Sequence, residues 1–393
     1  MLLAAFGDPG HAFPAIALGR ELAARGHEVC LQTWSRWRED VEREGMLFAP
    51  APEYQVFPTR EQALKPYVAA VRAAHETRPL VAAFDPHAVV VDILTVAAAM
   101  AAELEGRPWA TLVPHLLPVS EPGFPPYSVG ARLPRTRAGA ALWRAFDPLL
   151  RLGVERGREE LNGARGRVGL PPLSHVHGGI SRSLALVATF PQLEYPRVVA
   201  EPWVRTTGPL MWERPFEEEV SLPPGDDPLV LVAPSTSQDP EGRMVRGALE
   251  GLAGEPVRVL ATLNRPAAAG GALAVPPNAR VVDWLSYART MPRCAVVVCH
   301  AGHGTVARAL SCGVPVVACP AAGDMAENAA RVAWAGAGVS LPRRLSSARG
   351  VRLAVRRVLA EPGYGVRAGE LAVWAAEHDG AGRAAEEIEA FVG

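Results

Sequence analysis

Short apolar runs, glycine-bearing turns and helical patterns alternate along this chain. Leu2 to Phe6 and Leu229 to Ala233 are wholly apolar, and Ala88 to Asp92 is apolar up to its last residue. Such runs are typical of strands buried on both faces of a parallel sheet. Between the first two runs, Pro14 to Arg25 carries leucines four residues apart, the spacing of one helix face. The alternation predicts an α/β fold built on parallel sheets.

The clearest unit of this kind lies in the second half of the chain. It reads as a strand (Ala295 to Cys299), a turn (His300 to Thr305), a helix (Val306 to Ser311) and a further strand (Pro315 to Cys319). Glycines in the turn allow backbone N–H groups at the start of the helix to approach an anion closely. The turn therefore predicts a phosphate-binding site.

A change in composition divides the chain into two halves. Residues 201–228 hold several prolines and an acidic run, as expected of a domain boundary. We expect an N-terminal Rossmann-like domain (residues 1–210), a linker (211–227), a second Rossmann-like domain (228–380) and a C-terminal helix (381–393). A shared site is expected in the cleft between the two domains.

Composition excludes several classes of function. The 393 residues are 49% hydrophobic with a net charge of −1, so no basic surface for nucleic acid is predicted. The N-terminus lacks a basic leader, and the apolar stretch near Ile93 to Ala102 is shorter than a membrane span. We expect a cytoplasmic protein. The five cysteines are expected to be reduced. The spacing of Cys299, His300 and His303 does not match a zinc site, and no predicted strand ends in a D-x-D pair, so no metal site is expected.

Two residues at predicted strand ends are candidates for proton transfer. The turn GDPGH is not a dinucleotide fingerprint, but it places His11 between a strand and a helix. The positive end of the helix dipole opposes protonation, so a neutral imidazole is expected. Asp92 ends another strand and would lie at the same edge if the strands are parallel. Capping of the local turn by His11, and of the next helix by Asp92, remain alternatives.

The segments 51–78 and 114–151 are rich in proline, arginine and aromatic residues and show no clean period. Some of their side chains can line an apolar acceptor pocket or pack a local core. The candidates are Phe57, His115, Phe124 and Trp143. The basic, amphipathic segment from Leu142 to Arg158 is interpreted as a solvated helix face, with contact to a membrane surface as the alternative.

One stretch carries a resemblance to a known family. From Trp284 to Ala329 the chain contains H-x-G-x-x-T, then G-V-P, then P-x-x-x-D-x-x-x-N-A. In order and spacing this resembles the nucleotide-sugar signature of the family 1 GT-B glycosyltransferases that modify natural products. The resemblance implies two Rossmann-like domains facing a cleft, with the last helix crossing back to the first domain. It also implies inverting, metal-independent transfer of a sugar from a nucleotide diphosphate to an acceptor hydroxyl, as in antibiotic biosynthesis.

The resemblance also implies a role for individual residues. The histidine matching His11 is the general base of the family, and the aspartate matching Asp92 pairs with it. The remaining matches concern the donor: its diphosphate, its base and its sugar. These positions are Thr236, Ser237, Trp284, Leu285, His300, Gly302, His303, Gly304, Thr305 and Asp324.

The chain departs from the family pattern at two donor positions. Met325 stands where a glutamine commonly binds the sugar, and Arg308 stands where enzymes using UDP donors often carry a glutamate for the ribose. A guanidinium only donates hydrogen bonds, so it cannot accept two from ribose hydroxyls. We therefore expect a dTDP-linked deoxysugar in preference to UDP-glucose. A nucleotide-sugar epimerase, an N-acetylglucosaminyl transferase and a non-catalytic nucleotide-binding homologue remain alternatives.

Overall fold

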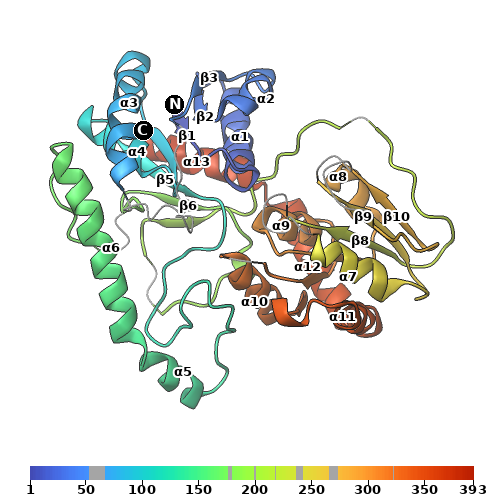
Figure 1. Cartoon of the computed structure of the whole chain (residues 1–393). Helices are drawn as coiled ribbons and strands as arrows, with labels where there is room; N and C mark the ends of the chain where they lie inside the picture. The colour runs from blue at the N-terminus through green and yellow to red at the C-terminus, as the bar shows by residue number, and fades with distance from the viewer. Residues whose placement is uncertain are drawn as a thin grey trace.

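The computed structural model describes residues 1–52, 67–175, 179–198, 201–216, 218–235, 242–264, 273–321 and 323–393. Within these residues the chain forms two sheets, and all strand pairs in both are parallel. Figure 1 shows the two sheets as separate layers, each flanked by helices. The α/β architecture predicted from the alternation of apolar runs and helical patterns is confirmed.

The first sheet has the strand order β3-β2-β1-β4-β5-β6-β7. Its strands are β1 (Leu2–Ala4), β2 (Cys30–Thr33), β3 (Leu47–Pro50), β4 (Val89–Asp92), β5 (Trp109–Val113), β6 (Ala185–Val187) and β7 (Val204–Thr206). Around it lie α1 (Pro9–Ala24), α2 (Arg38–Arg43), α3 (Val68–Phe84), α4 (Val96–Leu104), α5 (Arg137–Arg144) and α6 (Asp147–Arg167).

The second sheet has the strand order β10-β9-β8-β11-β12-β13. Its strands are β8 (Leu229–Ala233), β9 (Arg258–Thr262), β10 (Ala279–Val282), β11 (Val296–Cys299), β12 (Val316–Ala318) and β13 (Gly338–Ser340). Its helices are α7 (Arg243–Leu252), α8 (Tyr287–Thr290), α9 (His303–Ser311), α10 (Met325–Ala335), α11 (Ala348–Ala360) and α12 (Pro362–Glu377).

Strand order reverses once in each sheet. In the first sheet the chain proceeds outward from β1 in one direction and from β4 in the other, and in the second sheet the same occurs at β8 and β11. Loops leaving the two strands on either side of such a reversal diverge, and ligands of doubly wound folds bind in the resulting crevice. Any site built on this fold is therefore expected after β1 and β4 and after β8 and β11.

The last helix, α13 (Gly380–Val392), packs against α1 of the first sheet (Figure 1). Ala384, Ala385 and Ile388 belong to the same buried cluster as the apolar side chains of α1. At the surface, Glu389 binds Arg25 at 3.1 Å and His27 at 2.9 Å. The chain thus begins and ends in one domain, which ties the second domain to the first at both of its ends.

A buried core also joins the two domains. Leu116, Phe190 and Leu193 come from the first domain but pack in one cluster with Leu310 and other residues around β11 and α9. Leu193 belongs to η2 (Pro191–Leu193), a short 3-10 helix that faces α10. Because this cluster is apolar and continuous, it fixes how the two sheet edges face each other.

Candidate functional site at the domain junction

His11 and Asp92 form a hydrogen-bonded pair at the reversal point of the first sheet. Nδ1 of His11 lies 2.9 Å from Oδ1 of Asp92, whose side chain is fully buried, whereas 17% of the His11 side chain is exposed. The other carboxylate oxygen, Oδ2, accepts a hydrogen bond from the Phe6 backbone N–H at 3.0 Å. Both carboxylate oxygens therefore have donors, and the imidazole is held in one orientation.

Asp92 does not cap the helix that follows it. The N-cap of α4 is Thr95, whose hydroxyl donates to the Asp92 carbonyl at 2.8 Å and to the Ala4 carbonyl at 3.0 Å. Thr95 thus joins the ends of β1 and β4 below the hydrogen-bonded pair. This leaves the Asp92 carboxylate free for His11, so the capping alternative is excluded.

His11 lies inside α1, because the helix begins earlier than expected from Pro14. Asp8 is extended and precedes Pro9 at the first helical position, a position that suits proline since its missing N–H needs no partner there. Burial opposes protonation of His11, but the charge and hydrogen bond of Asp92 outweigh it and raise the pKa of His11. The helix dipole alone predicted an imidazole that resists protonation, whereas the net effect of burial and the nearby carboxylates is a raised pKa of His11.

At the reversal point of the second sheet, His300 joins the segments that follow the two central strands. Its side chain is 6% exposed, and its Nδ1 accepts a hydrogen bond from the Ser235 backbone N–H at 2.8 Å. Ser235 follows β8 and His300 follows β11, so this bond joins the ends of the two central strands. Thr236 and Ser237, the predicted contacts of the donor diphosphate, lie outside the described residues.

The turn after His300 contains a buried residue in the left-handed conformation. Ala301 has a positive φ of 60°, and the Asn328 side chain holds its carbonyl at 2.9 Å. Asn328 lies in the signature motif, yet the sequence alone assigned it no role. The hydrogen bond from Asn328 stabilises the left-handed conformation of Ala301. That conformation is energetically costly for a residue other than glycine.

The predicted phosphate turn lies at the N-terminus of α9. The first hydrogen bond inside the helix runs from the Val306 N–H to the Gly302 carbonyl, and no side chain caps the helix. The N–H groups before Val306 therefore have no partner within the helix. A Cβ placed on Gly302 or Gly304 would meet nothing within 4 Å, so an anion has room at both positions.

His303 differs from its neighbours in this turn because its side chain points away from the open space. It is 8% exposed, and its Nε2 donates to the Ala188 carbonyl of the first domain at 3.1 Å. Burial, with the charge of His115 second, lowers the pKa of His303 to about 4. The side chain therefore joins the domains as a neutral group, while its backbone remains part of the turn.

The other residues predicted to bind the nucleotide-sugar donor lie around this turn. Trp284 is 48% exposed and thus available for stacking, whereas Leu285 is 8% exposed and packs in the core. Asp324 is the residue before α10, and Met325 begins that helix and packs partly against the core. Oδ2 of Asp324 lies 3.3 Å from Nδ2 of Asn328, so the same asparagine holds both the turn and this carboxylate.

Asp324 connects the two halves of the site electrostatically. Its negative charge contributes to raising the pKa of His11 and opposes the lowering of the pKa of His115 and His303 by burial. A carboxylate of the second domain therefore acts electrostatically on imidazoles of the first. The two sets of residues predicted from separate halves of the chain therefore lie at one junction.

The structure places three of the four predicted acceptor residues, and these three lie apart. His115 lies beside His11, with ring centroids 6.1 Å apart. Phe124 is 9% exposed and packs edge-on against Tyr195, and Trp143, on α5, contacts Phe146. Phe57 lies outside the described residues. Only His115 of the described three is placed next to the hydrogen-bonded pair.

Charged side chains also join the domains beside the site. Arg331 of α10 binds Glu327 at 2.7 Å and the Leu193 carbonyl at 3.0 Å. Its guanidinium lies 3.4 Å from the centre of the Tyr195 ring and 3.4 Å from Glu194. The sequence does not indicate this group, because Arg331 and Glu327 are neighbours on α10 whereas Leu193 lies 138 residues earlier in the chain, with no motif to connect them.

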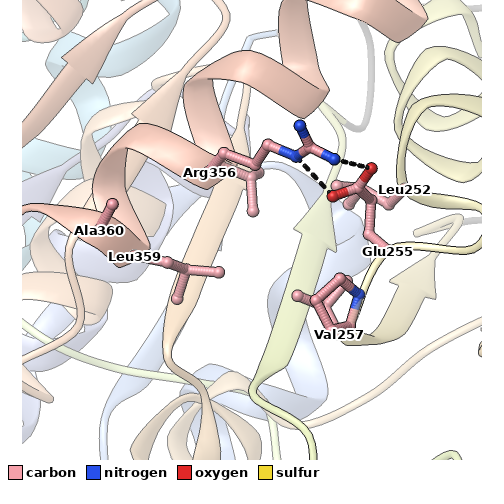
Figure 2. A pocket seen from close by; sticks show the side chains of 8 residues that line it. Leu252, Glu255, Val257, Arg356, Leu359 and Ala360 are labelled. Carbon is pink, nitrogen blue, oxygen red and sulfur yellow. Dashed lines mark hydrogen bonds and ion pairs between the residues drawn. The ribbon is translucent and has the colours of Figure 1, made fainter.

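A hollow on the outer face of the second domain lies away from this junction. It has a volume of about 410 Å³ between α7 and α11 (Figure 2). The charged groups that Figure 2 shows there, Glu255 and Arg356, bind each other through two contacts of 2.7 and 2.8 Å. Their charges are thus already paired, and we assign this hollow no part in the site.

Two further observations concern the described part of the chain. None of its helices combines the length and the apolar character that crossing a bilayer requires. No three of its histidine, cysteine and acidic side chains gather in a way that could hold a metal ion. Cys30, Cys299 and Cys319 are buried free thiols, as expected, and burial raises the pKa of Cys299 to about 12.

Comparison with known proteins agrees with this geometry. Residues 1–109 match the glycosyltransferase family 28 N-terminal domain, and residues 251–388 match the C-terminal domain of erythromycin biosynthesis protein CIII-like proteins. The 4'-demethylrebeccamycin synthase of Lentzea aerocolonigenes is 30% identical over all of this chain and 99% of its own length. The O-mycaminosyltylonolide 6-deoxyallosyltransferase of Streptomyces fradiae is 30% identical over 98% of this chain and 96% of its own.

Solved structures share the whole fold. The glycosyltransferase of kitacinnamycin superposes with a TM-score of 0.77 at 22% identity, covering 99% of this chain and 98% of the other. Glycosyltransferase VinC in complex with dTDP superposes with a TM-score of 0.70 at 18% identity, covering 100% of this chain and 98% of the other. Together with the two full-length relatives, these matches confirm the family inferred from the signature between Trp284 and Ala329. The chain belongs to the GT-B glycosyltransferases of the bacterial natural-product type and is an NDP-sugar-dependent glycosyltransferase.

Proposed function

We propose that this chain transfers a deoxysugar from a dTDP-linked donor to a hydroxyl of a small, largely apolar natural product, with inversion at the anomeric carbon. His11 acts as the general base through Nε2, and Asp92 orients the ring and stabilises the imidazolium. The bond between acceptor oxygen and anomeric carbon forms as the bond from that carbon to the diphosphate oxygen breaks. The acceptor proton moves to His11, and dTDP leaves with the bonding electrons.

The observation that carries this proposal is the 2.9 Å contact between His11 and Asp92. With Nδ1 donating to Asp92, the unprotonated Nε2 is the atom left to take a proton. Asp324 lies close enough to raise the pKa of His11, and it is the residue proposed to bind hydroxyls of the donor sugar. The base therefore lies beside the place where the anomeric carbon would be held.

The leaving diphosphate is proposed to bind at the N-terminus of α9. The N–H groups of Gly304 and Thr305 and the positive end of the helix dipole stabilise the growing charge. His300 lies at the same point, and Trp284 is proposed to stack on the nucleotide base with Leu285 beside it. These groups provide the electrostatic stabilisation that a divalent metal supplies in other transferases, so the reaction is proposed to need no metal.

The donor is inferred from two residues and from the names of relatives. Met325 offers no hydrogen bond to a sugar hydroxyl, and Arg308 cannot accept hydrogen bonds from a ribose. One full-length relative is named for the transfer of a 6-deoxyallosyl group, and VinC was solved with dTDP. A less hydroxylated sugar on dTDP fits these positions better than UDP-glucose does.

Competing donors test this assignment. Initial rates are measured with dTDP-linked deoxysugars, dTDP-glucose and UDP-glucose against a mass-spectrometric panel of aromatic and macrocyclic acceptors. We expect the highest kcat/KM with a dTDP-deoxysugar, and a product of inverted anomeric configuration by NMR. A clear preference for UDP-glucose, or retention of configuration, would refute the corresponding part of the proposal.

A further inference from the structure

A second imidazole, that of His115, stands next to the proposed base. Its ring centroid lies 6.1 Å from that of His11, and the two ring planes are nearly perpendicular, at 84°. His115 follows β5 (Trp109–Val113), the strand beside β4, so the sheet itself places it near Asp92. Neither histidine is fully buried by its neighbours.

Hydrogen bonds fix which ring nitrogen of each histidine carries the proton. Nδ1 of His115 lies 2.8 Å from the Leu116 carbonyl, and a carbonyl oxygen only accepts, so Nδ1 must donate. Nδ1 of His11 likewise donates to Asp92. In the neutral ring, the lone pair of each histidine is therefore on Nε2.

Both Nε2 atoms are available to a ligand. Within the described residues neither is hydrogen-bonded to protein, and neither is among the buried side-chain atoms that lack a partner. The Tyr127 hydroxyl approaches His115 from the Nδ1 side, at 3.3 Å. The site thus presents two imidazole lone pairs, on rings whose centroids lie 6.1 Å apart.

The two rings differ in their tendency to become charged. Burial lowers the pKa of His115, and the positive charge of His11 lowers it further, against smaller opposing effects of Asp324 and Asp92. His11 is the ring whose pKa is raised. When His11 takes a proton, His115 therefore stays neutral, and its Nε2 can only accept a hydrogen bond.

We propose that His115 is a specificity-determining residue that accepts, through Nε2, a hydrogen bond from a second O–H or N–H group on the acceptor, close to the hydroxyl that His11 deprotonates. The preferred acceptors carry two neighbouring donors, as in a catechol or an amide beside a hydroxyl. This inference rests on the proposed role of His11. It involves no second proton transfer, because His115 gains no proton when the acceptor binds.

Binding of matched coumarins tests the proposal without requiring turnover. Umbelliferone has one hydroxyl, esculetin has two adjacent hydroxyls, and scopoletin is esculetin with the second hydroxyl methylated. Dissociation constants are measured by fluorescence at saturating dTDP, and sugar transfer is assayed separately. We expect esculetin to bind about tenfold more tightly than scopoletin, the contribution of one buried hydrogen bond.

Substitutions of His115 separate the acceptor atom from its structural role. In His115→Asn the amide N–H can replace Nδ1–H as the donor to the Leu116 carbonyl, but nothing replaces Nε2. The ratio of the dissociation constants of scopoletin and esculetin should therefore fall to about one. In His115→Gln the amide oxygen can reach the position of Nε2, so part of the preference should remain. His75→Asn, at an exposed position on α3, is the matched control and should keep the wild-type ratio.

Two results would overturn the inference. One is equal binding of esculetin and scopoletin to the wild-type chain, and the other is a preference that persists in His115→Asn. Since the readout is binding, either result would leave the role of His11 in transfer untouched. Conversely, the expected ratios without detectable transfer would support His115 while counting against the proposed function.

Discussion

Nδ1 of His11 and Oδ1 of Asp92 lie 2.9 Å apart although 81 residues separate them in the chain. The proximity follows from the sheet, because β1 and β4 are adjacent and parallel and both residues lie at or beyond the carboxyl ends of these strands. Adjacent parallel strands at a reversal point bring such residues together whatever the intervening sequence. The pair is therefore a property of the topology as much as of the two side chains.

Replacement of Asp92 should change both the rate and its pH dependence. Because the Asp92 charge raises the pKa of His11 against burial, Asp92→Asn should lower that pKa, and the acid limb of the kcat/KM profile should move to lower pH. Loss of orientation should reduce kcat by about a hundredfold. An unmoved acid limb would show that this limb reports another group.

Gly304→Ala should weaken donor binding without harming the fold. The added Cβ meets no protein atom within 4 Å, but it enters the space proposed for a phosphate oxygen, so we expect the Kd for dTDP to rise about tenfold. Gly163→Ala on α6, where a Cβ also meets nothing, is the matched control. Both variants should be as stable as wild type or up to about 1 kcal/mol more stable. Unchanged dTDP affinity in Gly304→Ala would place the phosphates elsewhere.

The junction between the domains should weaken in mild acid through His303. Its pKa is lowered by burial to about 4 in the folded chain, below the value of about 6.5 expected when unfolded. Between these values the unfolded chain binds more protons, so stability is present above pH 6.5 and is lost as the pH falls toward 4. We expect a loss of about 2 kcal/mol between pH 6.5 and 5 from this residue.

His303→Gln separates this effect from other titrations. The glutamine N–H can still donate to the Ala188 carbonyl but does not titrate in this range. Urea unfolding at pH 7 and pH 5 should therefore show a smaller loss of stability in the variant than in wild type. Equal losses in both proteins would exclude His303 as the titrating group.

Arg331 should be required for stability, because its removal would leave the buried carboxylate of Glu327 without its charged partner. Arg331 is 4% and Glu327 3% exposed at their side chains, so Arg331→Met should cost about 3–5 kcal/mol in unfolding free energy. Neutralising the partner as well, in Glu327→Gln with Arg331→Met, should restore much of that loss. A double-mutant cycle by urea denaturation measures the coupling, and strictly additive effects would contradict the account.

The sequence predicts the framework of this molecule well and its side-chain contacts less well. β8 was predicted at its observed bounds, because a five-residue apolar run between polar segments has few alternatives. The start of α1 was missed since Pro9 was interpreted as part of a turn, although proline is favoured at a first helical position. The local pattern indicates that His11 and Asp92 follow strands and lie at the same edge of a parallel sheet, and the family resemblance implies that they pair.

Other contacts could not be anticipated, because they depend on how the two domains meet. Nothing in the turn HAGHGT distinguishes a histidine directed at a phosphate from one directed at the Ala188 carbonyl, as His303 is. Glu194 of the first domain likewise meets the Arg331–Glu327 pair of α10 only after the domains pack. Phe124 and Trp143 were chosen as aromatic residues in irregular segments, and that property does not indicate which of them a sheet edge will bring near the site.

Single-turnover rates and dTDP binding of His11→Ala test the central claim most directly. With an acceptor that the wild-type chain glycosylates, the rate should fall by at least about a hundredfold, while the Kd for dTDP stays within about twofold of wild type. His75→Ala provides the control for loss of an exposed histidine. A His11→Ala variant that transfers sugar at the wild-type rate would contradict the assignment of His11 as the base and, with it, this account of the site.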